Sequence, residues 1–148
     1  GFGNAGVHLP HGMSYPVAGM VRDHWHEGYV VDHPLVPHGV SVILNTPAVV
    51  RFTASANPER HLRAARALGA DVSDAAPSEA GEVLAERVIH FMRALHIPNG
   101  LAAVGYTEQD IPALVEATLP QHRVTKLSPK PAGAAELTSL FEESMTIW

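Results

Sequence analysis

Residues 78–96, which read SEAGEVLAERVIHFMRALH, decide the fold class. Their large apolar side chains recur three and four residues apart, so on an α-helix they would form one apolar stripe. The stripe consists of Leu84, Val88, Phe91, Met92 and Leu95, and the charged side chains lie mostly off it. Pro98-Asn99-Gly100 follows and ends the pattern. The segment predicts an amphipathic helix that packs against a core.

Further helix signals surround this segment. Asn57-Pro58-Glu59 has the order of an N-cap, a first-position proline and a first-turn acid, and Gly69 stops that helix. Other helices are predicted at three places: from Pro37 to a kink at Pro47, from Asp110 to Leu119, and after Gly133. The alternation typical of a half-buried strand is nowhere sustained. We therefore predict an all-α fold with at least five helices, in a single domain spanning residues 1–148.

The N-terminal quarter carries weaker signals. Residues 4–20 could form a helix only against intrinsic propensity, because glycines and prolines interrupt them. Residues 21–36 are predicted to be a long connection, and residues 126–133 an extended one. The first six residues match G-x-G-x-x-G, but no strand precedes them and no second strand follows, as a dinucleotide site requires. We therefore expect no cofactor-binding residue in this chain.

Composition excludes several functional classes. The net charge is −5 and the acidic and basic residues are scattered, which argues against nucleic acid or an anionic membrane as a partner. The chain has no cysteine, so it has no disulfide and no thiolate metal site. No apolar run approaches the roughly 20 residues of a membrane span, and the N-terminus lacks the features of a signal peptide. We expect a location in the cytoplasm, or in the mitochondrial matrix of a eukaryote.

Histidine is unusually abundant. The ten histidines equal the ten lysines and arginines together. Six of them fall in the first quarter: His8, His11, His24, His26, His33 and His38. One interpretation is a histidine-rich surface loop. The other is a metal site, since neutral imidazole is the commonest metal ligand in proteins.

Two motifs favour the metal site. HGMSYP at residues 11–16 and PHG at residues 37–39 resemble the HGMxxP and PHG metal-ligand elements of iron-containing (group III) alcohol dehydrogenases. Further segments resemble the hydroxyacid-oxoacid transhydrogenase branch of that family. They are VDHPLVPHG at 31–39, PERHL at 58–62, LAAVGY at 101–106 and ALV at 113–115. The resemblance covers essentially the whole chain.

The resemblance implies a fold and a site. The fold is the helical C-terminal, metal-binding domain of these enzymes, without their N-terminal nucleotide-binding domain. His11 and His38 match two of four metal ligands, and the remaining Asp and His would come from an upstream helix. The metal is Fe²⁺, or Zn²⁺ as a substitute, and NAD(P) would be bound mainly by the missing domain. Tyr15 stands where the family often has a histidine near the nicotinamide, so it is the candidate catalytic residue.

The implied activity is hydride transfer between a 4-hydroxy acid and a 2-oxo acid through a nicotinamide cofactor. The metal would act as a Lewis acid on the substrate oxygen. The chain would supply one half of that cleft, so alone we expect it to be inactive and to bind metal weakly or not at all. Two alternatives stay open. One is an iron-dependent dehydrogenase of simple alcohols or diols, and the other is a stand-alone helical metal-binding or interaction module.

Other residues have more than one interpretation. His8 could replace a ligand or could orient one, and residues 22–27 could shape an acid-binding pocket or form a solvated loop. Candidates for binding a substrate carboxylate are Arg22, Lys126 and Lys130. His61, His90, His96 and His122 are interpreted as surface or boundary residues. We also expect apolar surface to be exposed around Phe2, Val7, Met13 and Val17, and to favour a homo-oligomer.

Overall fold

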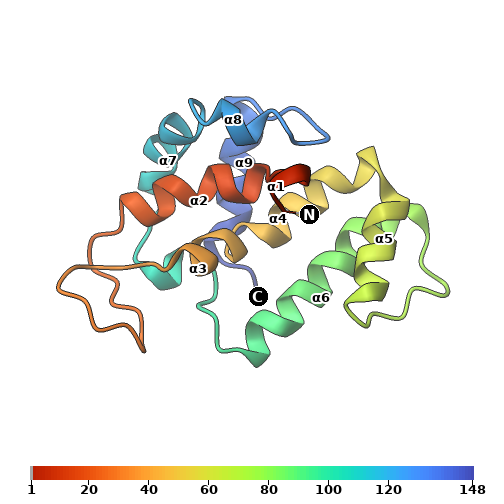
Figure 1. The fold of residues 1–148 in the computed structure, drawn as a ribbon, viewed down its shortest axis with the longest axis horizontal. Helices are drawn as coiled ribbons and strands as arrows, with labels where there is room; N and C mark the ends of the chain where they lie inside the picture. Colours follow the sequence, from red (N-terminus) through yellow and green to blue (C-terminus); the bar gives the residue numbers. More distant parts are fainter. Residues whose placement is uncertain (1) are drawn as a thin grey trace.

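The computed structural model describes residues 2–148, and the side chains of residues 3–148. This part of the chain is helical and contains no β-strand; an isolated bridge joins Trp25 and Leu35. The helices are α1 (Phe2–Ala5), α2 (Leu9–Gly19), α3 (His38–Ile43), α4 (Thr46–Thr53), α5 (Pro58–Ala67), α6 (Ala80–Ala94), α7 (Ile111–Thr118), α8 (His122–Thr125) and α9 (Ala134–Met145). Short 3₁₀ turns lie at Ala54–Ala56, Pro77–Glu79, Ala102–Val104 and Glu108–Asp110. The predicted all-α fold is confirmed (Figure 1).

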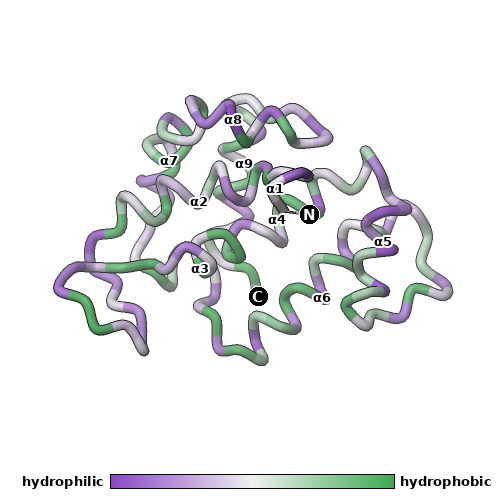
Figure 2. Tube along the Cα trace, in the orientation of Figure 1, coloured by the Kyte–Doolittle hydropathy of each residue, from purple (hydrophilic) through white to green (hydrophobic). Residues whose placement is uncertain are grey.

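The core lies where α4 packs against α6 and α9. Helix α2 packs against α3 and α7 (Figure 1). Phe141 of α9, Leu44 and Met92 of α6 are among its largest fully buried side chains. Figure 2 shows hydrophilic and hydrophobic residues alternating along α6, as an amphipathic helix requires. Helices α2 and α3 lie side by side next to this core.

The predicted stripe of α6 is only partly inward. Leu84, Val88 and Met92 are buried, but Phe91 is 37% and Leu95 is 70% exposed. The helix packs against α4 and α5. The apolar stripe predicted for this segment therefore extends from the core onto the surface at Phe91 and Leu95.

Helix α2 forms despite its composition. It contains Pro16 in its interior, and Pro10 and Gly12 in its first half. Its stability comes from burial, because Leu9, Met13 and Val17 recur at every fourth position. The expectation that Met13 and Val17 lie on exposed apolar surface is wrong: both are fully buried, and Val7 is half-buried. The side chain of Phe2 lies outside the described residues.

Helix α8 was absent from the sequence prediction. Helix α8 is one turn long and packs on α2 at Gly12, where an added Cβ would lie 2.7 Å from Thr125 Cγ2. Glycine at this position therefore allows the two helices to approach closely. The kink predicted at Pro47 is a break instead: α3 ends at Ile43 and α4 begins at Thr46, with Pro47 in its first turn.

The remaining connections agree with the prediction. Residues 21–36 form no helix, and residues 126–133 form turns and extended chain. Helix α1, a single helical turn, lies within the glycine motif, and no strand is found around it among the described residues; Gly1 itself lies outside them. No helix of the described chain is long and apolar enough to cross a membrane.

Candidate metal centre

The structure brings His11 and His38 together. His11 lies in the first turns of α2 and His38 is the first residue of α3, and the two helices pack against each other. Their ring centroids are 5.3 Å apart, with the rings at 65°. Two imidazoles from segments far apart in the sequence thus face one another at the edge of the domain.

Local bonds hold the backbone of both histidines. Ser14 Oγ donates to the carbonyl of His11 at 2.8 Å, and Ser41 Oγ donates to the carbonyl of His38 at 2.8 Å. Burial lowers the pKa of His11, and the neighbouring His38 lowers it further. A lowered pKa keeps the ring neutral near pH 7, which is the form that binds a metal ion.

Tyr15 lies beside this pair. It follows His11 by one helical turn on the same face of α2. Its ring is nearly parallel to that of His38, with centroids 6.3 Å apart and an angle of 12°. The three predicted site residues therefore form one cluster.

His8 lies next to the cluster, on the N-terminal side of α2. Its Nδ1 atom is buried and has no hydrogen-bond partner among the described residues. Burial lowers the pKa of His8, and its neighbours His11 and His61 lower it further. A buried ring nitrogen without a partner is a polar group still to be satisfied.

The cluster fits a metal ion in part. Imidazole is a suitable ligand for Fe²⁺ and Zn²⁺, and two imidazoles converge here. Within residues 2–148, however, no group of three or more His, Asp or Glu side chains is arranged to hold an ion. The described chain therefore brings together two candidate ligands, half of the number that the resemblance implies.

The far end of α2 is held by contacts that sequence reasoning missed. Buried Tyr106 donates its hydroxyl to the carbonyl of Val17 at 2.7 Å, in the last helical turn, where carbonyls lack helical partners. Beside it, Arg22 donates two hydrogen bonds to Asp110, at 2.8 and 3.0 Å. Asp110 also accepts the backbone N–H of Thr107 at 2.8 Å, in a capping box. Only this capping box could have been identified from the sequence.

These contacts change the interpretation of Arg22. Both of its terminal nitrogens bind Asp110, and the guanidinium lies 5.9 Å from the centroid of the Tyr106 ring. Hydrogen bonding by Arg22 is the main cause that lowers the pKa of Asp110. Arg22 thus pairs within the domain, which argues against its role as the carboxylate-binding residue. Another candidate for that role, Lys130, has its Nζ 4.2 Å from the centroid of the Phe52 ring.

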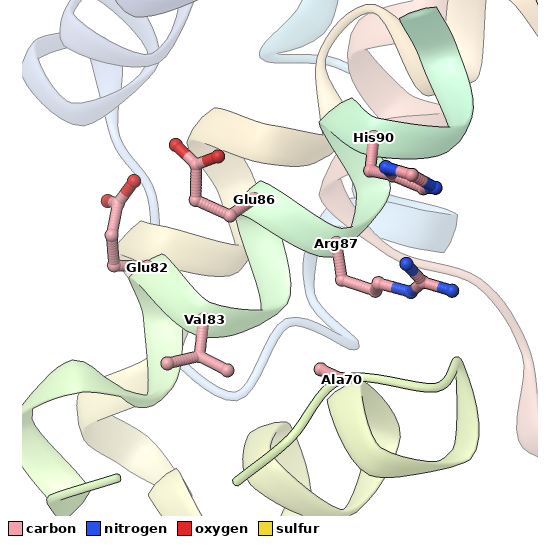
Figure 3. A pocket seen from close by; sticks show the side chains of 6 residues that line it. All are labelled: Ala70, Glu82, Val83, Glu86, Arg87 and His90. Atoms are coloured by element: carbon pink, nitrogen blue, oxygen red, sulfur yellow. The ribbon is translucent and has the colours of Figure 1, made fainter. Parts of the chain in front are cut away.

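A shallow pocket on α6 lies outside this centre. It is lined by Ala70, Glu82, Val83, Glu86, Arg87 and His90, and Figure 3 shows the two carboxylates projecting to one side of α6 and Arg87 and His90 to the other. Arg51 binds Glu82 through two hydrogen bonds, and Arg87 donates to the carbonyl of Leu68. The charged groups are used in packing α4 and α5 against α6, so the pocket offers no second catalytic constellation.

Tyr106 makes the free energy of unfolding depend on pH in the alkaline range. Burial raises the pKa of Tyr106 to about 12, with Arg22 opposing and Asp110 adding to the shift. Folding therefore favours the neutral phenol, and this stability is present below about pH 10 and lost as the pH rises through 12. The two-unit shift corresponds to about 2–3 kcal/mol.

The measurement is urea unfolding of Tyr106→Phe and the parent chain at several pH values. Near pH 8 the variant should be about 1–2 kcal/mol less stable, because it loses the bond to Val17. Above pH 11 the difference should shrink and reverse. The exposed Tyr29 provides a control, Tyr29→Phe, which should leave the profile unchanged. A constant difference from pH 8 to 12 would contradict the role of burial.

Comparisons with known proteins agree with this architecture. Residues 1–145 match the family model described as "Fe-containing alcohol dehydrogenase family, C-terminal". The chain is 60% identical over 148 residues to the hydroxyacid-oxoacid transhydrogenase, mitochondrial, of Xenopus tropicalis and 57% identical to that of Homo sapiens. All of this chain is covered, but only 32% of each relative.

Solved structures share the fold. A 1,3-propanediol oxidoreductase superposes with a TM-score of 0.76 at 22% identity, over 91% of this chain and 32% of that one. An alcohol dehydrogenase from Oenococcus oeni gives 0.78 at 20% identity, over 93% and 32%. The chain thus spans about a third of the length of the proteins that it matches. It belongs to the Fe-containing alcohol dehydrogenase family and corresponds to the helical C-terminal domain of that family.

Proposed function

We propose that this chain is the metal-binding, substrate-facing domain of an enzyme that transfers hydride between a 4-hydroxy acid and a 2-oxo acid. The observation that carries the proposal is the convergence of His11 and His38, from the two motifs of the family, at 5.3 Å between ring centroids. The choice of substrate class is supported by relatives at 55–60% identity that are named hydroxyacid-oxoacid transhydrogenases.

Each residue of the cluster has a role in the proposal. His11 and His38 hold Fe²⁺, or Zn²⁺ in its place, through neutral ring nitrogens. When bound, the metal supplies a Lewis acid that polarises the substrate oxygen and eases loss of the hydroxyl proton. Tyr15 is the catalytic residue: its ring lies beside and nearly parallel to that of His38, and its hydroxyl can take part in moving the proton. NAD(P) is bound mainly by a nucleotide-binding domain outside this chain.

Dehydrogenation of a simple alcohol or diol is the second candidate. The pairing of Arg22 with Asp110 favours it, because that pairing withdraws one of three cations proposed to bind a substrate carboxylate. Lys126 and Lys130 remain as candidates for that role. Hydroxy-acid specificity then requires one of them, or a cation of the nucleotide-binding domain, to face the substrate.

An assay of the full-length protein separates the two candidates. With a 4-hydroxy acid and a 2-oxo acid supplied together, and no free nicotinamide added, the transhydrogenase should turn over both, because its cofactor is retained between half-reactions. A simple diol should be oxidised far more slowly. Rapid diol oxidation that depends on added NAD(P)⁺, with no reduction of the 2-oxo acid, would favour the second candidate. For the location, the relatives' names support a mitochondrial protein over a cytoplasmic one.

A further inference from the structure

We propose that the connection between α2 and α3 contains a second metal site, a two-histidine chelate formed by His24 and His26 that binds Zn²⁺ or a similar divalent ion such as Ni²⁺. The site is separate from the His11–His38 centre and does not depend on the proposed enzymatic activity.

The distance between the two ring nitrogens carries the proposal. His24 Nε2 and His26 Nδ1 lie 3.3 Å apart. Two imidazole nitrogens bound to one tetrahedral Zn²⁺ at 2.0–2.1 Å are about 3.3–3.4 Å apart, so the pair already has the spacing of neighbouring ligands. With the ring centroids 5.6 Å apart, the two nitrogens point at one another as in a hydrogen bond, so each ring would turn to aim its nitrogen at a shared ion while the nitrogen spacing is kept.

The backbone holds the two rings in this arrangement. His24 and His26 flank Trp25, which forms a parallel bridge with Leu35, and the N–H of Leu35 donates to the carbonyl of His24 at 2.8 Å. In extended chain, side chains two residues apart point to the same side. The ring of Tyr29 contacts His26 edge-on, with centroids 5.6 Å apart. The backbone thus keeps the two rings close to each other before an ion binds.

The partial burial of the two rings and the neutral form of His24 also favour binding of a metal ion. Both histidines are half-buried, whereas Asp23, Trp25 and Glu27 around them are exposed. Burial lowers the pKa of His24, and His26 lowers it further, so the ring is neutral near pH 7. Neutral imidazole pairs suit Zn²⁺, Ni²⁺ and Cu²⁺ better than Mg²⁺ or Ca²⁺.

The site would be open and exchangeable. In the part of the chain that the structure describes, no third His, Asp or Glu joins the pair in one ligand group. Water would therefore complete the coordination, and affinity would be well below that of a four-ligand structural site. Because residues 21–36 connect the helices that carry His11 and His38, an ion bound here would stiffen that connection.

The test uses the full-length protein with His11→Ala and His38→Ala together, so that the family's metal centre does not contribute. Calorimetric titration with zinc chloride, and separately with nickel chloride, should show one ion bound per chain through the loop. His24→Ala and His26→Ala should each weaken that binding by about tenfold or more, since each removes one of two ligands. Circular dichroism should show unchanged helix content.

His90→Ala is the matched control, because His90 is an exposed histidine on α6, and it should leave the titration unchanged. Binding that persists when His24 and His26 are both replaced would overturn the proposal. So would the absence of loop-dependent binding in the background variant, which would leave the pair as two imidazoles sharing a hydrogen bond. Neither result bears on the His11–His38 centre, which is tested separately.

Discussion

Replacing His38 by alanine is expected to remove the metal from the full-length enzyme and to lower its turnover about a thousandfold or more. Metal activation is worth several kcal/mol of barrier, and each 1.36 kcal/mol corresponds to a factor of ten in rate. His11→Ala should have the same effect, because His11 faces His38 at 5.3 Å between ring centroids. Elemental analysis of the purified variants and initial rates at saturating substrate measure the two quantities together.

His90→Ala is the appropriate control for this experiment. His90 is exposed on α6 and lines the shallow pocket of Figure 3, so both metal content and turnover should be retained. His61 would be a poor control, because it is half-buried. Its Nδ1 donates to the carbonyl of Asn57 at 2.9 Å, and its Nε2 lies 3.1 Å from Thr53 Oγ1. A His11 or His38 variant that kept both its metal and its turnover would contradict the proposed centre.

Gly100→Ala should destabilise the domain by about 3 kcal/mol, the largest effect on stability that we predict for a single methyl group. Gly100 has φ +81°, and an added Cβ would lie 2.7 Å from the carbonyl carbon of Met145 and 2.8 Å from the oxygen of Ser144. These atoms belong to the end of α9, which the turn covers: the N–H of Leu101 donates to the Ser144 carbonyl at 2.9 Å. Backbone atoms cannot move aside without disrupting this contact.

Gly105→Ala separates the two causes of that loss. Gly105 also has a positive φ, +93°, but no atom lies within 4 Å of an added Cβ. It should therefore show only the conformational cost, about 1 kcal/mol. The midpoint temperature of thermal unfolding should drop by about 6–12 °C for Gly100→Ala and by about 2–4 °C for Gly105→Ala. Equal losses at the two positions would show that the contact with α9 contributes nothing.

Helices with local signals were predicted well. Helix α5 begins at Pro58 behind its Asn57 cap, and Asn57 Oδ1 accepts the N–H of Arg60 as the cap prediction requires. Helix α2 could not be predicted with the same certainty, because its glycines and prolines oppose helix formation. It forms because Leu9, Met13 and Val17 are buried between neighbouring helices. Helix α8, one turn long, carries too few residues for a periodic pattern.

The candidate site divides in the same way. The sequence identified His11, Tyr15 and His38 through their motifs, and the structure places all three in one cluster. The sequence contains no indication that Tyr106, almost ninety positions away, contacts α2 and holds its last turn. Nor did it indicate that Arg22 is paired with Asp110.

By itself, therefore, the sequence determined the all-α class and most of the helices, and it singled out the two histidines that are candidate metal ligands. Caps, apolar periodicity and short motifs act over a few residues, so they can be identified without knowing the fold. Only the tertiary structure decided which side chains meet: His11 with His38, Arg22 with Asp110, and His24 with His26 at a ligand-like distance. The first two contacts depend on how helices and loops pack in three dimensions, and no local pattern encodes a distance between distant residues. The third depends on the extended conformation of the connection, which the bridge between Trp25 and Leu35 fixes.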